Sequence, residues 1–125
     1  MEELHQQSIE WLNEIVFWRD ETAFFYTLIV SDTLHNVPEK YEIKRIKIED
    51  ELIKISSGEL DTLEKEVELH ERYLDILIKG RRADEEIYRD IHKDLMFKFY
   101  DFEAKLKSLK KEIFSLVESG KHQIS

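Results

Sequence analysis

The stretch that decides the fold runs from Leu52 to Leu77 and reads LIKISSGELDTLEKEVELHERYLDIL. Spacings of three and four, which line one face of an α-helix, continue through its glycine. The positions expected to face inward are Arg45, Glu49, Leu52, Ser56, Leu60, Leu63, Val67, His70, Leu74 and Leu77. Because a turn would reset this phase, the pattern predicts one unbroken helix, weakened at Gly58 by about 1 kcal/mol relative to alanine. The alternative is a break at Ser56–Gly58 and a bundle of four helices.

Outward from this stretch, three breaks divide the chain. Asn36 and Pro38 suit the end of one helix and the first turn of the next, and Gly80 and Gly120 suit C-terminal caps. The segments between them are rich in helix formers, and no period-two alternation or hairpin dipeptide interrupts them. We therefore expect an all-α fold, an antiparallel bundle of three long helices at about 3–36, 38–79 and 82–119, in one domain spanning 1–125.

Composition excludes several classes of function. The 125 residues include 19 basic and 28 acidic side chains, a net charge of −9, and no cysteine. This excludes disulfide frameworks, cysteine zinc sites and thiol nucleophiles, and it argues against nucleic-acid binding. Charges at Glu14, Arg19, Asp20 and Glu21 interrupt the apolar stretch 12–30, so we expect no membrane span and a cytoplasmic protein.

The last segment has an ordinary amphipathic pattern, whereas the first is apolar almost all round. The expected inward stripe of the last segment is Ile87, Ile91, Leu95, Phe99, Phe102, Leu106, Leu109, Ile113 and Val117. In the first segment, Trp11, Trp18 and Phe25 lie at heptad spacing, as in a coiled coil, while Ile9 and Val16 fall on nearly the opposite side. Two neighbouring helices cannot cover such a surface, so we expect a homodimer with the first helices at the seam.

Two carboxylates lie within the most apolar part of the chain. Glu14 and Glu21 are one heptad apart, between the tryptophan stripe and a flank formed by Phe17 and Phe24. A buried carboxylate must be paired, metal-bound or protonated. The alternatives are an alternative metal site formed by these two carboxylates, an ion pair with a lysine or arginine of a neighbouring helix, or a position at the solvent rim.

Three histidines are expected at one height. His70 and position 4 are equally far from a turn near Val37, and His70 and position 92 are equally far from a turn near Arg81. His5, His70 and His92, with Glu66 one turn before His70, could therefore hold a transition metal such as zinc or iron. No His-x-x-x-His pair supports this, so surface and core histidines remain the alternative.

The first segment also carries a resemblance. The pattern Trp11-x-x-Glu14-x-x-Phe17-Trp18-x-Asp20-Glu21 resembles a signature of small all-helical proteins of Bacteroidota-type bacteria that have no established activity. The resemblance covers mainly the first helix and implies a stand-alone helical protein. No phosphate-binding loop or nucleophile motif occurs, so we do not favour an enzyme.

Three functions remain open. The first is a self-associating, non-enzymatic helical bundle that acts as an interaction or scaffold module. The second is a metal-binding bundle, ferritin-like or hemerythrin-like in its logic. The third is a carrier of a small apolar ligand, with a cavity lined by Trp11, Trp18 and Phe99.

Overall fold

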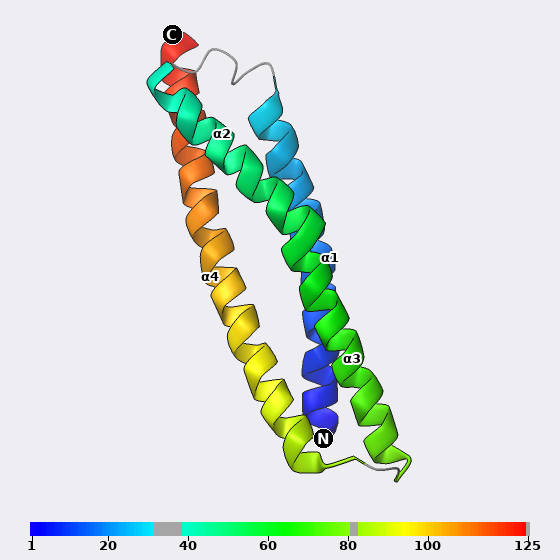
Figure 1. The fold of residues 1–125 in the computed structure, drawn as a ribbon. Coiled ribbons are helices and arrows are strands. Elements are labelled where there is room, and N and C mark those ends of the chain that lie inside the picture. The colour runs from blue at the N-terminus through cyan, green and yellow to red at the C-terminus, as the bar shows by residue number, and fades with distance from the viewer. Residues whose placement is uncertain (32–38, 81–82, 125) are drawn as a thin grey trace.

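The computed structural model describes residues 1–31, 39–80 and 83–124, with side chains placed as far as residue 119. These residues form helices and no strand: α1 (Glu2–Val30), α2 (Glu39–Lys54), the π-helical turn η2 (Ile55–Glu59), α3 (Leu60–Ile78) and α4 (Glu85–Ile124). Since α2, η2 and α3 follow one another directly, the described chain makes three rods. Figure 1 shows α1 and α4 running in one direction and the middle rod returning in the opposite direction, crossing from beside the upper end of α4 to the other side of α1. The prediction of an all-helical protein is confirmed.

The middle rod continues through Gly58 because the chain there makes a π turn. The N–H of Leu60 donates to the carbonyl oxygen of Ile55, five residues back. Both residues are fully buried, although a spacing of five in an α-helix would turn the second side chain well away from the first. The wider turn absorbs the extra residue and keeps both halves facing the core. In Figure 1 the rod bends at this level, as is usual where a π turn interrupts a helix.

The unbroken rod was predicted correctly, but its inward phase before Gly58 was wrong. The buried side chains of α2 are those of Ile48 and Leu52, and Ile55 follows them in η2. Ser56, which we expected to face inward, is exposed. Its hydroxyl instead donates to the carbonyl oxygen of Ile53, 3.2 Å away. Arg45 and Glu49 lie half-buried at the edge of the packed face, paired with each other at 3.3 Å.

The helix ends differ from the expected ones at three places. α1 stops at Val30, because Ser31 has an extended backbone and its hydroxyl donates to the carbonyl oxygen of Leu28 at 2.8 Å. Asn36 and Pro38 lie outside the described residues. Gly80 ends the middle rod as predicted, with a φ of 69° and its N–H on the carbonyl oxygen of Leu77. α4 begins at Glu85 and continues through Gly120 to Ile124, so the expected stop at 119 was wrong.

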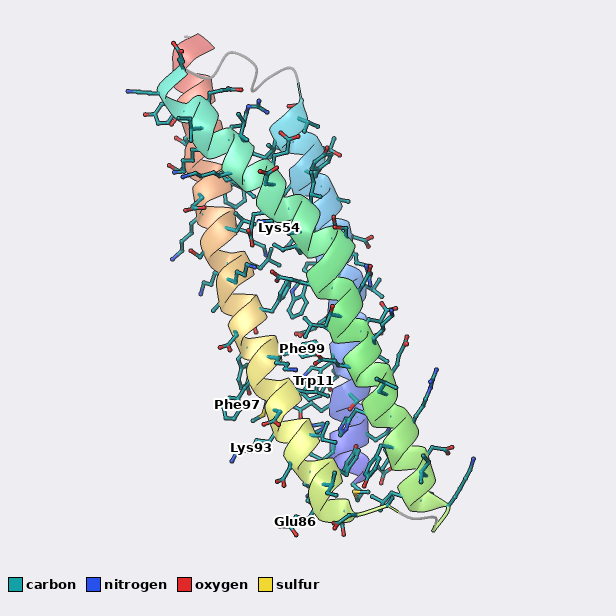
Figure 2. All side chains as sticks on the ribbon, viewed as in Figure 1. Trp11, Lys54, Glu86, Lys93, Phe97 and Phe99 are labelled. Carbon is teal, nitrogen blue, oxygen red and sulfur yellow. The ribbon has the colours of Figure 1, made fainter. Side chains whose placement is uncertain are left out.

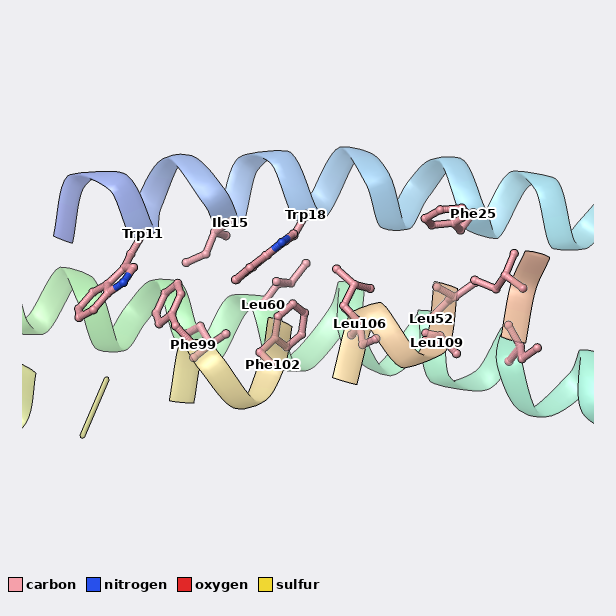
Figure 3. Close-up of a cluster of buried hydrophobic side chains, with 14 of the residues drawn as sticks. Trp11, Ile15, Trp18, Phe25, Leu52, Leu60, Phe99, Phe102, Leu106 and Leu109 are labelled. Atoms are coloured by element: carbon pink, nitrogen blue, oxygen red, sulfur yellow. The ribbon is translucent and has the colours of Figure 1, made fainter. Parts of the chain in front are cut away.

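Buried side chains on α1 and α4 alternate in spacings of three and four. On α1 they are Ser8, Trp11, Ile15, Trp18, Thr22, Phe25 and Ile29; on α4 they are Tyr88, His92, Leu95, Phe99, Phe102, Leu106, Leu109, Ile113 and Leu116. Figure 3 shows the α1 side chains pointing toward the other two rods. The expected α4 stripe was therefore wrong at its ends. Ile87 and Ile91 are exposed and Val117 is half-buried, because a strict seven-residue repeat drifts from the 3.6-residue period that we applied.

Candidate functional site

A buried pair of histidines joins α3 to α4 near the lower end of the bundle. His70 and His92 are 2% and 4% exposed, and Nε2 of His70 lies 2.9 Å from Nδ1 of His92. This confirms the prediction that these two residues share one height. The hydrogen bond therefore connects two helices through residues that are 22 positions apart in the sequence.

Gln7 links this histidine pair to α1. Its Oε1 lies 2.7 Å from Nε2 of His92. Because a carbonyl oxygen only accepts, His92 carries its proton on Nε2 and accepts at Nδ1 from Nε2–H of His70. Nδ1 of His70 is then unprotonated, and it has no hydrogen-bond partner in the described part of the chain.

Aromatic rings enclose both imidazoles. Tyr88 stacks on His70 with ring centroids 4.2 Å apart, and Trp11 stacks on His92 at 4.5 Å. Burial, with the neighbouring His92, lowers the pKa of His70 to about 4. Burial also lowers the pKa of His92, although the Glu71 carboxylate opposes this shift. Both rings are therefore neutral at pH 7.

The other two predicted metal ligands do not join this pair. Nδ1 of His5 lies 2.5 Å from Oε2 of Glu71, and Glu66 forms an ion pair of 2.9 Å with Lys98. Within residues 1–31, 39–80 and 83–124, no three His, Cys, Asp or Glu side chains form a group that could hold a metal ion. Structural zinc sites use four ligands, so metal binding stays a prediction that this geometry does not favour.

Sequence reasoning missed Gln7 and Glu71, and it did not predict that Tyr88 stacks on His70. Gln7 lies one turn before Trp11 and Tyr88 one turn before His92, so spacings of four could have placed them on the same faces. Tyr88 is completely buried, and burial followed by the nearby Glu71 carboxylate raises its pKa to about 12. No periodicity signals Glu71, because it lies beside the packed face of α3.

The rings proposed to line a ligand cavity pack against one another. Trp11 stacks on Phe99 at 4.9 Å, and Trp18 lies 5.7 Å from Phe99 and 4.7 Å from Phe102 between ring centroids. In Figure 2, Trp11 and Phe99 lie between the rods, whereas Lys93 and Phe97 point outward from α4. This packing is typical of a core, so the carrier function stays a prediction without further support.

The two candidate buried carboxylates differ in their surroundings. Glu21 is half-buried and forms an ion pair with Lys110 of α4. Glu14 is exposed, in agreement with the alternative of a position at the solvent rim. Partial desolvation, together with the nearby Glu103 and Glu10 carboxylates, still raises its pKa. Glu14 therefore belongs to a group of like charges at the surface.

A second feature is the side of the bundle where α1 meets α4, here called the α1/α4 face. Its large exposed side chains are Phe17 (60%) and Phe24 (62%) of α1 and Tyr100 (56%) and Phe114 (55%) of α4. Phe25 connects the two helices, since its ring packs edge-on against both Phe24 and Phe114. A cleft of about 600 Å³ opens on this face, lined by Asn13, Glu14, Phe17, Glu103, Lys107 and Lys110, among others.

Charges are only partly paired both on the α1/α4 face and on the other side of α4, where Asp94 and Asp101 form no ion pair within the described residues. On that other side, Lys98 pairs with Glu66, and Lys105 pairs with Glu51 at 2.6 Å and with Glu59. On the α1/α4 face, Glu14, Glu103 and Lys107 form no ion pair within the part of the chain that the structure describes. The α1/α4 face therefore combines exposed aromatic rings with charges that lack a partner.

Comparison of this chain with known proteins identifies no similar protein. No family model, curated protein or solved structure matches this chain. Among the described residues, no helix is long and apolar enough to cross a membrane.

Proposed function

We propose that this chain is a non-enzymatic helical module that self-associates as a homodimer through the α1/α4 face. The observation that carries the proposal is the exposure of Phe17, Phe24, Tyr100 and Phe114, each more than half accessible on one side of the bundle. Exposed aromatic rings gathered on one side of a protein often mark sites of protein contact, and aromatic rings are enriched among the residues that dominate binding energy.

A second copy is the partner that this surface fits best. The core already uses one stripe of α1, and the two neighbouring rods do not cover Phe17 and Phe24. A two-fold interface uses the same patch on both copies, so each exposed ring gains an apolar neighbour. Covering one such ring contributes about 1–2 kcal/mol from the area removed from water.

Molar mass in solution tests the proposal directly. We expect light scattering at micromolar concentration to give a dimer for the natural chain and a monomer for the double variant Phe17→Gln/Phe24→Gln. The matched control is Leu69→Gln on α3, which replaces an equally exposed side chain (60%) outside the α1/α4 face and should leave the dimer intact. A natural chain that is monomeric at these concentrations would refute the proposal.

A further inference from the structure

The self-association proposed above leaves the relative direction of the two copies open, and the charges on the α1/α4 face point to one direction. We infer that the second copy packs antiparallel, so that Lys107 of each copy lies against Glu14 and Glu103 of the other. This inference rests on the proposed dimer and adds its geometry.

The vertical order of the groups on this face follows from contacts between α1 and α4. The two helices run in the same direction (Figure 1), and Trp11 is level with Phe99 while Phe25 is level with Phe114. Glu14 is correspondingly close to Glu103, whose charge contributes to the raised pKa of Glu14.

Charge changes sign along the face. The lower end carries the carboxylates of Glu14 and Glu103, with Glu10 nearby. One turn above Glu103 on the same side of α4 stands Lys107, and Lys110 follows at the spacing of the next turn. Since Lys110 is already paired with Glu21, the charges of this face that lack a partner are acidic at Glu14 and Glu103 and basic at Lys107, with Phe17 level with the point between them.

A two-fold axis can relate two such faces in two ways. If the copies run parallel, each group lies at the height of its own counterpart, so that the level of Glu14 and Glu103 in one copy faces the same level of the other, and Lys107 stays level with Lys107. If they run antiparallel about a point midway between Glu103 and Lys107, each acidic end meets a basic end. Only the antiparallel arrangement supplies a cation to Glu14 and Glu103 and an anion to Lys107.

The antiparallel axis also places an aromatic ring at the centre. A point midway between Glu103 and Lys107 is level with about Phe17 on α1, given the contacts of Trp11 and Phe25 described above. Phe17 of one copy then packs near Phe17 of the other, surrounded by the charge pairs. Apolar anchors at the centre and charges at the rim are the usual anatomy of a specific interface.

Charge-swap variants test the direction. The first variant is Lys107→Glu, and the second is Glu14→Lys/Glu103→Lys; all three positions are exposed, so both variants should fold with the helical content of the natural chain. Each variant alone places like charges together at both contacts, and we expect its dimer to dissociate at least about tenfold more readily. In a 1:1 mixture, opposite charges meet at both contacts, and we expect a heterodimer at least as tight as the natural dimer.

Single cysteines give an independent readout, because the natural chain has none. Phe17→Cys should form an intermolecular disulfide under mild oxidation, since the axis passes close to this residue. Phe24→Cys should not, because the two copies of residue 24 lie about 20 Å apart along the helix in the antiparallel dimer, at 1.5 Å per residue. A parallel dimer would keep the two copies of residue 17 level with each other and likewise the two copies of residue 24, so it would not favour residue 17 over residue 24 in this way.

The outcomes separate the two proposals. A dimeric natural chain with restored association in the mixture, and with cross-linking at residue 17 alone, supports the antiparallel geometry. A dimer that is unaffected or tightened by Lys107→Glu, or that cross-links at residue 24, overturns the geometry and leaves the proposed dimer standing. A monomeric natural chain overturns both.

Discussion

At the scale of single residues, the burial of His70 and His92 determines how the lower end of the bundle responds to protons. Each ring stacks on an aromatic neighbour and uses a nitrogen to bind the other, and Gln7 supplies a contact from α1. Protonating either ring would place a charge in apolar surroundings. A proton added to His92 would remove the acceptor at its Nδ1, and a proton added to Nδ1 of His70 would have no hydrogen-bond partner. The pair therefore stabilises the fold only while both rings are neutral.

The free energy of unfolding should consequently fall as the pH drops below 6.5. An unfolded histidine titrates near 6.5 and folded His70 near 4, so between these values the unfolded chain binds more protons. The loss between pH 6.5 and 4 is on the order of 3 kcal/mol for His70. Urea unfolding at several pH values would measure it.

Comparison of variants isolates the contribution of His70 from that of the carboxylates. His70→Leu should flatten the profile between pH 5 and 6.5, where most carboxylates are already ionised. Parallel profiles for the natural chain and His70→Leu would contradict this account of the pair.

The same two histidines show how much of the site the sequence could predict. Equal distances from a turn were sufficient to place His70 beside His92. They could not predict that Gln7 contacts His92 or that Tyr88 stacks on His70, because height along a helix says nothing about rotation around it, and the assumed phase of α4 was one residue off at that end. The hydrogen-bond network became visible only when the rotation of each helix was fixed by packing.

At the scale of elements, the π turn reconciles two core stripes that an α-helix could not align. The step from Ile55 to Leu60 was present in the sequence, but Ser56 also fitted a spacing of four, and periodicity alone did not distinguish them. Hydrophobicity does, since Ile55 is apolar and fully buried while Ser56 is exposed. A spacing of five between strongly apolar residues, beside serine and glycine, is a usable signal of such a turn.

The glycines at the two ends of α3 should respond oppositely to alanine. Nothing lies within 4 Å of a β-carbon built on Gly58, and its φ is not positive, so Gly58→Ala should stabilise the protein by about 0.5–1 kcal/mol through helix propensity. Gly80 has equally open surroundings but a φ of +69°, so Gly80→Ala should destabilise it by about 1–2 kcal/mol. Urea unfolding at one protein concentration measures both changes.

These two substitutions control for each other. Both reduce the freedom of the unfolded chain in the same way, so the difference between them reports the backbone conformation of the folded state. If Gly58→Ala proved as destabilising as Gly80→Ala, the π turn would require a residue without a side chain, and its role in aligning the two stripes would need another explanation.

At the scale of the whole molecule, the breaks and periodicity of the chain were sufficient to predict long helices. The proposed function depends instead on the apolar surface that the packing of these helices leaves exposed. Trp11, Trp18 and Phe25 fill the core as their heptad spacing indicated. Phe17 and Phe24, which the same helix carries on its flank, stay exposed, as expected for a helix with too few neighbours. The sequence could not show that Phe114 and Lys107 of α4 would complete this surface, because that depends on how α4 is rotated against α1.

The proposed self-association through this surface would make thermal stability depend on protein concentration. A ligand or partner that binds only the folded chain stabilises it by mass action, and a tenfold change in concentration corresponds to about 1.4 kcal/mol in a dimerisation equilibrium. We therefore expect the Tm of the natural chain to rise by a few degrees for each tenfold increase in protein concentration, measured by circular dichroism. Phe17→Gln/Phe24→Gln should melt at one temperature throughout, because its folded state is monomeric. Identical Tm values for the natural chain over a hundredfold range would show that folding does not draw on a second copy.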